Sequence, residues 1–168
     1  MINGNADPLY RLRRVGDIMP AMDDLSQGIL KGLLGRAEAS KAKGADLLRD
    51  LWINPGGFDR HVVKRVTRGH AEDAGDYASK TFGAIAAARK LVIAMPANKD
   101  GLVSGKISAV MDRWVVIFSE DGRIVTSYPF DPNKVTFEER HRQNGDSIHE
   151  CTISREISRL FARVFGLS

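Results

Sequence analysis

Cysteine and long apolar runs are almost missing from this sequence, and each absence excludes a class of protein. Cys151 is the only cysteine among 168 residues, so an internal disulfide and a cysteine-based zinc site are excluded. A chain without disulfides is typical of a reducing compartment. No apolar run approaches the roughly 20 residues of a membrane span, and the first 17 residues lack the apolar stretch of a signal peptide.

A large excess of one charge is also missing. Lys and Arg number 25 against 21 Asp and Glu, which gives a net charge of +4 with neutral histidine. Such a small excess is compatible with nucleic-acid binding but does not argue for it. The chain is 43% apolar and 27% charged, which is typical of an ordinary globular protein. Its length suits one domain, with or without a helical extension.

The first third of the chain is expected to be helical. Apolar side chains recur at helical spacing in two groups, Ile29, Leu30, Leu33 and Leu34, and then Leu47, Leu48 and Leu51. We expect two helices with a break near Leu34–Gly35, packed on the rest of the chain or on a partner. The sequence Asn54-Pro55-Gly56-Gly57 is a turn or linker signal. It predicts a helical N-terminal region over residues 1–57 and a second domain over residues 58–168.

A short basic helix is predicted directly after this linker. At about 100° per residue, one side carries His61, Lys64, Arg65 and Arg68, and the other carries Val62, Val63 and Val66. Gly69 is well placed to end the helix. The helix is therefore expected to bury its valines. Its basic side is either an ordinary solvated face or a site where cations hold a phosphate while His61, with a usual pKa of about 6.5, exchanges a proton.

Residues 113–130, RWVVIFSEDGRIVTSYPF, give the clearest prediction, a β-hairpin. Two β-rich runs flank Asp121-Gly122, a favoured two-residue turn. This register places Ile117 opposite Thr126 and Val115 opposite Tyr128. Alternation along the second strand then puts Ile124, Thr126 and Tyr128 on one face and Val125 and Ser127 on the other.

The hairpin also suggests where a site would lie. Both faces of Trp114–Phe118 are apolar, which predicts a central strand covered on each side. Thr126 and Tyr128 would project together near the end of such a strand. Hydroxyl side chains fill a core poorly but can line a site.

The remaining segments complete an α+β prediction, with N-terminal helices packed on a small twisted antiparallel sheet. Residues 72–90 are expected to be helical with a possible break at 79–82, residues 91–95 a buried strand, and residues 106–112 a helical turn or a strand edge. Residues 136–150 are expected to be a polar loop, which makes His141 and His149 surface residues rather than metal ligands. The apolar spacing in residues 151–166 predicts a docking helix, or a late strand followed by a helix.

Three short motifs occur together in this chain: RHVVKRV at 60–66, Ser-Lys-Thr-Phe at 79–82 and Thr-Ser-Tyr-Pro at 126–129. In this combination, the region from about Phe58 to Pro132 resembles the toxin ribonuclease domains at the C-termini of bacterial contact-dependent inhibition and other polymorphic toxins. Two lineages share the layout, the ribonuclease A-like toxins and the barnase–EndoU–colicin–RelE group. The resemblance implies a toxin delivered to act in the cytoplasm of a target cell.

The resemblance also implies roles for individual residues. His61 matches the helix histidine and would be a general base or acid. Thr126 would orient the scissile phosphate or stabilise charge on its oxygens, and Tyr128 would position the nucleotide or donate a hydrogen bond. The cation beside the histidine falls on Arg65 or on Arg68.

A departure from the pattern leaves the catalytic histidine open. In the ribonuclease A-like pattern a basic residue tends to come further after the histidine, at a place where this chain has Glu72. His70 is therefore the alternative catalytic histidine, which would leave His61 on the helix surface.

The implied reaction is cleavage of RNA, with tRNA as one candidate substrate, by attack of a 2′-hydroxyl on the adjacent phosphorus, and it calls for no metal or cofactor. A cognate immunity protein would be the expected partner. Two other classes stay open. In a non-catalytic RNA-binding module, Lys64, Arg65 and Arg68 would only hold phosphates. In a secretion-system interaction module, Thr126 would lie on an ordinary edge strand.

Overall fold

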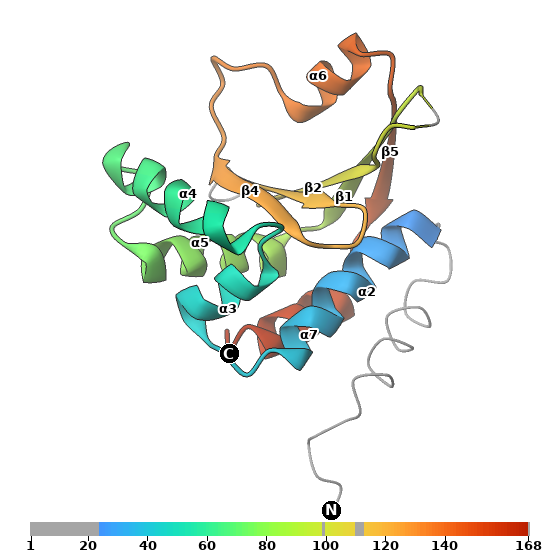
Figure 1. Ribbon diagram of the computed structural model, residues 1–168. Coiled ribbons are helices and arrows are strands. Elements are labelled where there is room, and N and C mark those ends of the chain that lie inside the picture. The colour runs from blue at the N-terminus through green and yellow to red at the C-terminus, as the bar shows by residue number, and fades with distance from the viewer. Residues whose placement is uncertain (1–23, 99, 110–112, 168) are drawn as a thin grey trace, which may run out of the picture.

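A five-stranded antiparallel sheet divides the molecule, with most of the helices on one side of it (Figure 1). The computed structural model describes residues 24–98, 100–109 and 113–167. The helices are α2 (Asp24–Ala39), α3 (Gly44–Leu51), α4 (Pro55–Thr67), α5 (Ala74–Ala87), α6 (Phe137–Gln143) and α7 (Arg155–Val164). The strands are β1 (Lys90–Met95), β2 (Ser104–Ala109), β3 (Trp114–Ser119), β4 (Ile124–Pro129) and β5 (Ser147–Thr152). Their order in the sheet is β4-β3-β2-β1-β5.

The hydrophobic core lies between the sheet and helices α2, α3, α5 and α7 (Figure 1). Strand β3 sends Trp114, Val116 and Phe118 into this core. The N-terminal helices bury the leucines and isoleucines of both predicted apolar groups in the same core, so the α+β prediction is confirmed. None of the helices in the described ranges is long and apolar enough to cross a membrane.

The β3–β4 hairpin has the predicted cross-strand pairs, Val115 with Tyr128 and Ile117 with Thr126. A β-bulge interrupts the ladder, because the next pair is Phe118 with Ile124. An extra residue in one strand changes the face to which the following side chains point. Ile124 is therefore fully buried in the core and does not share a face with Thr126 and Tyr128, which corrects that prediction. Strand β4 also lies at the edge of the sheet rather than at its centre.

Three segment predictions need correction. Helix α2 runs through Gly35 as far as Ala39, so the first break comes later than predicted. Residues 55–57 form the first turn of α4, where Asn54 caps the helix by accepting a hydrogen bond from the Gly56 amide. This is a helix start rather than a linker. The segment expected to be a polar loop contains α6 and β5.

The hairpin turn docks on α2 through backbone contacts that leave no room for a side chain. A Cβ atom added to Gly32 would lie 2.0 Å from the Asp121 carbonyl oxygen, and one added to Gly122 would lie 2.3 Å from the Ile29 carbonyl oxygen. Gly122 also has a φ of 85°, in the left-handed region that favours glycine. The two glycines therefore fix how closely the hairpin approaches the helix.

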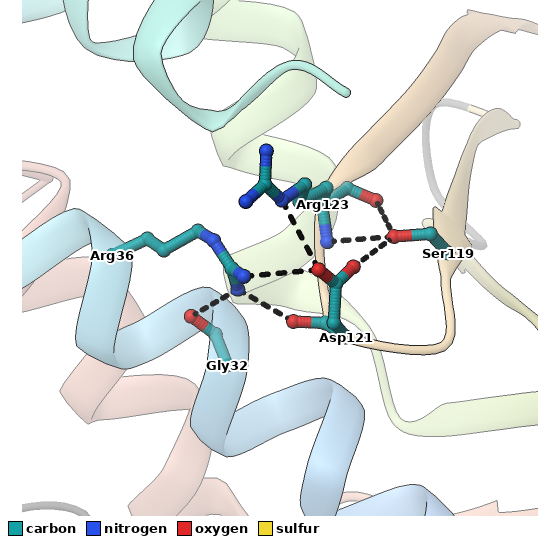
Figure 2. A network of polar contacts seen from close by, with 5 residues as sticks. All are labelled: Gly32, Arg36, Ser119, Asp121 and Arg123. Atoms are coloured by element: carbon teal, nitrogen blue, oxygen red, sulfur yellow. Dashed lines mark hydrogen bonds and ion pairs between the residues drawn. The ribbon is translucent and has the colours of Figure 1, made fainter. Parts of the chain in front are cut away.

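Arg36 of α2 also binds the hairpin turn, through Asp121 (Figure 2). The Arg36 guanidinium donates to the Asp121 carbonyl oxygen at 2.6 Å and to its carboxylate at 3.0 Å. Ser119 and Arg123 also bind this carboxylate, at 2.5 Å and 3.1 Å. The pKa of Asp121 is lowered: partial burial opposes this, but the Ser119 hydroxyl and the two arginines outweigh it. The turn of the hairpin is thereby held on α2.

Two glycine-to-alanine substitutions in one helix test this docking. Gly28→Ala should raise the free energy of unfolding by about 0.5–1 kcal/mol, because alanine favours a helix interior and a Cβ there meets nothing within 4 Å. Gly32→Ala should lower it by about 2–3 kcal/mol, since the new methyl group pushes the hairpin away. Urea unfolding of the two variants measures both effects. A stabilising Gly32→Ala would contradict the close approach.

Candidate functional site

A cleft of about 870 Å³ lies on the face of the sheet opposite the main core. Its floor includes Val115 and Ile117 of β3 and Thr126 and Tyr128 of β4. The chain from Phe130 to His141, which includes most of α6, forms a second wall and arches over this face (Figure 1). The C-terminal end of α4 and the turn after it form a third wall. The end of α4 and the later stretch from β3 to α6, which are distant in the sequence, therefore border one space.

The walls of the cleft are strongly basic. Seven of the lining residues are Lys or Arg and one is acidic, Asp131; the cations are Lys64, Arg65, Arg68, Lys106, Arg113, Lys134 and Arg140. Lys106 pairs with Glu138 of α6. Within the described ranges, the other six cations form no ion pair with an acidic side chain. The cleft is thus much more basic than the +4 of the whole chain suggests, and it suits an anionic ligand.

Arg65 is the buried cation of this cleft. It is only 7% exposed, its Nε has no hydrogen-bond partner in the described structure, and its guanidinium carbon lies 5.6 Å from the centre of the Tyr128 ring. A charged group taken out of water is costly unless an opposite charge compensates it. A bound anion would supply that compensation.

The burial of Arg65 overturns the predicted valine stripe on α4. Val63 and Val66 are 65% and 37% exposed. The inward face of α4 is set instead by Phe58, which is fully buried. Because residues four and seven positions apart lie on one face of a helix, Phe58 carries Val62 and Arg65 inward with it.

The cations at the end of α4 repel one another. The pKa of Lys64 is lowered by Arg68, then by Arg65, by slight desolvation and by Lys134. Each of these four residues lines the cleft. Like charges held this close destabilise the free protein and favour an anion between them.

His70 faces the cleft just beyond α4. Gly69, with a φ of 73°, ends the helix as predicted, and the His70 amide then donates to the Arg65 carbonyl at 2.8 Å. The Nδ1 atom of His70 is buried and has no partner in the described structure. Burial lowers the pKa of His70, and Arg65 and Arg68 lower it further. The imidazole is therefore kept neutral near pH 7, the form that accepts a proton.

His61 is not brought to the cleft. Its ring packs on Trp52, with ring centres 5.1 Å apart, and it lines a separate hollow of about 150 Å³ with Gly57, Arg60 and Lys64. Burial is the main cause of its lowered pKa. Of the two candidate histidines, only His70 shares a space with Thr126 and Tyr128.

A second histidine of the cleft was missed by the sequence reasoning. His141 of α6 lines the cleft, and its Nδ1 lies 2.8 Å from a carboxylate oxygen of Asp146. Asp146 is itself held by the amide of Ala97. The prediction that His141 is an ordinary surface residue is therefore wrong, whereas His149 is exposed on β5.

One signal in the sequence could have found this histidine. Thr136-Phe137-Glu138-Glu139 has the pattern of a capping box, and both of its reciprocal hydrogen bonds are present. It starts a helix that carries His141 on the second turn. Such a helix, with Asp146 five residues after the histidine, would have marked the segment as ordered rather than as a loop.

Strand β4 is held in place by hydrogen bonds on its core-facing side. Ser127, fully buried, accepts from Trp114 Nε1 at 2.6 Å and lies 2.8 Å from the Thr81 hydroxyl, while its carbonyl oxygen accepts from Tyr77 at 2.6 Å. Ser127 points into the core, so its neighbours Thr126 and Tyr128 point into the cleft.

The Tyr128 hydroxyl is protonated in the cleft. Burial raises the pKa of Tyr128, although Arg140 and Arg65 oppose this. Its hydroxyl therefore stays protonated at neutral pH and remains a hydrogen-bond donor. No group of three or more His, Cys, Asp or Glu side chains in the described ranges is arranged to hold a metal ion.

Residues 43–165 match the model of the family described as "Uncharacterised protein aq_aa01". The chain belongs to this family. The matched residues run from the start of α3 to the end of α7, so they include all three walls of the cleft and leave out α2. No curated protein and no solved structure matches the chain.

Titration of the histidines tests the electrostatics of the cleft. We expect the pKa of His70 in the folded protein to lie below about 6.5, and Arg68→Gln to raise it, because one of the repelling charges is removed. Arg163→Gln, on the exposed side of α7, should leave it unchanged. NMR titration of the ring signals measures these values.

The same shift has a consequence for stability. The unfolded chain takes up a proton before folded His70 does, so the free energy of unfolding should fall as the pH drops below about 6.5. The effect should be smaller in Arg68→Gln. A raised pKa for His70 would contradict this account of the cleft.

Proposed function

We propose that this protein is an endoribonuclease toxin domain that cleaves RNA in the basic cleft by metal-independent transesterification. The observation that carries the proposal is the buried Arg65, which has no acidic partner in the described ranges and lines a cleft that also holds two histidines and the Thr126 and Tyr128 hydroxyls. Phosphodiesters supply the anion that these cations lack. RNA also carries its own nucleophile, so the protein needs only acid, base and charge stabilisation.

The two histidines of the cleft, His70 and His141, would each carry out one of the two proton transfers. Neutral His70 suits the base that takes the proton from the 2′-hydroxyl as its oxygen attacks the phosphorus. His141, whose Nδ1 is bonded to Asp146, suits the acid that gives a proton to the departing 5′-oxygen. The products are a 2′,3′-cyclic phosphate and a free 5′-hydroxyl.

The remaining cleft residues stabilise the phosphate. Arg65 is preferred over exposed Arg68 as the cation that contacts the non-bridging oxygens, because it is buried beside Tyr128. Thr126 and Tyr128 would donate hydrogen bonds to the same oxygens or to the nucleotide. Charge stabilisation in a site shielded from water is commonly worth at least as much as the proton transfers.

A delivered toxin of this kind implies a partner. A free ribonuclease would damage the cell that makes it, so we expect a cognate immunity protein. The unpaired cations around the cleft favour an acidic partner that covers its mouth. Such a partner would block substrate and relieve the repulsion among Lys64, Arg68 and Lys134.

A cleavage assay tests the reaction. Wild-type protein should cut total bacterial RNA, or purified tRNA, in excess EDTA and leave 2′,3′-cyclic phosphate ends. We expect His70→Ala and His141→Ala each to lower the rate by about 10²- to 10⁴-fold. His149→Ala removes an exposed histidine outside the cleft and should leave the rate unchanged.

The same assay separates the alternatives. Loss of activity in His61→Ala but not in His70→Ala would keep the ribonuclease and overturn the histidine assignment. If folded wild-type protein cuts none of these RNAs, the non-catalytic RNA-binding module becomes the better explanation, because the same cations would hold RNA without cutting it.

Binding should follow the cations of α4. Lys64→Gln and Arg68→Gln should each weaken RNA binding and reduce the slope of log affinity against log salt by about 0.7, the value expected for one lost contact to a single strand. Fluorescence anisotropy at several salt concentrations measures the slope. Lys90→Gln, on the exposed end of β1, is the matched control, and an equal change there would argue against a localised binding cleft.

A further inference from the structure

Aromatic side chains lie among the cations of the cleft. Its lining includes Tyr128, Phe130 and Phe137. Phe130 follows directly after β4 and is 36% exposed, which is unusual for so large an apolar side chain. Phe137 is half-buried and packs against His141, with ring centres 4.4 Å apart.

Two of these rings are paired with arginine. The guanidinium carbon of Arg113 lies 5.3 Å from the centre of the Phe130 ring, and that of Arg65 lies 5.6 Å from the centre of the Tyr128 ring. The Phe130 amide also donates to the Arg113 carbonyl at 2.5 Å, which fixes the two residues side by side. Flat cationic and aromatic groups of this kind are surfaces on which nucleobases stack.

We propose that the cleft takes an unpaired, single-stranded segment of RNA, with Phe130 and Arg113 stacking a base at its rim. The inference rests on the proposed function for the choice of RNA, and it adds the class of RNA that fits. Cations hold the phosphates of the segment, while the aromatic residues hold its unstacked bases.

The size of the cleft supports a single strand. A volume of about 870 Å³ lies within the roughly 300–1,000 Å³ of sites that enclose a small molecule, so it holds only a few nucleotides. Proteins that read duplex RNA instead contact its phosphates and 2′-hydroxyls over roughly 16 base pairs. The rings of Tyr128 and Phe137 line this hollow beside buried Arg65, and the bases of a duplex would have to leave their stack to reach them.

The position of Phe130 relative to the reacting groups also fits. Thr126 and Tyr128 belong to β4, and Phe130 continues the same chain two residues further on. A base held by Phe130 would therefore lie next to the phosphate held by Arg65 and Tyr128. Stacking at this place would position the substrate rather than merely add affinity.

Binding to uncleavable RNA tests the inference. The probes are a fluorescein-labelled 12-nucleotide 2′-O-methyl RNA and a blunt duplex of the same sequence. A 2′-O-methyl group removes the nucleophile, so binding is measured whether or not the protein cuts RNA. By fluorescence anisotropy at fixed salt, we expect wild-type protein to bind the single strand at least about 10-fold more tightly.

Phe130→Ala should weaken binding of the single strand by roughly 5- to 100-fold and leave duplex binding almost unchanged. Phe130→Trp should restore it, because indole also stacks. Leu102→Ala, which removes another exposed apolar side chain outside the cleft lining, should change neither. Circular dichroism of each variant verifies that it is folded.

The outcomes separate this inference from the proposed function. Equal or tighter binding of the duplex, or an equal loss for both probes in Phe130→Ala, would overturn the single-strand inference even if RNA is cleaved. Selective binding that depends on Phe130, without any cleavage of natural RNA, would support it and count against the ribonuclease.

Discussion

The close approach of two backbones, at Gly32 of α2 and Gly122 of the hairpin turn, is the constraint on which the site depends. It sets the position of the β3–β4 hairpin against the helical layer, and Arg36 holds the turn there. The hairpin in turn supplies the floor of the cleft. The family match begins after α2, so the helix that fixes this hairpin lies outside the part of the chain that matches the family model.

Strand β4 performs two tasks on its two faces. Ser127 joins a buried network with Trp114 and Thr81, while its neighbours face the cleft. A rigid strand beneath a site limits the movement of the side chains above it, and this precision matters for proton transfer and phosphate positioning. It also means that the three consecutive hydroxyl residues do not form one group. Two belong to the candidate site and the middle one to the core.

Much of the fold follows from local patterns, and much of the site does not. The Asp121-Gly122 signal located the hairpin correctly. The turn itself is one residue longer than predicted, because Ser119 rather than Glu120 bonds to Arg123, and the β-bulge offsets this so that the pairs from Ile117 onward still match the prediction. Ile124, which the bulge turns into the core, forms a β-bridge with Trp52 and accepts a hydrogen bond from the Ile53 amide, and no local pattern contains these distant contacts. On α4 the inward face is set by Phe58. The helical arrangement used for the prediction began at His61 and therefore did not include Phe58. His141 and Asp146 join the cleft only because the chain after β4 folds back over the sheet.

The cations of the cleft that lack an acidic partner destabilise the free protein by electrostatic repulsion. Lys64, Arg68 and Lys134 repel one another around buried Arg65, and folding has to hold them together without a counter-charge. Any polyanion that binds the folded cleft and not the unfolded chain shifts the folding equilibrium toward the native state. The melting temperature of this protein would therefore rise with any polyanion that binds the cleft, and a preparation that carries such an anion would melt at a higher temperature than one freed of it.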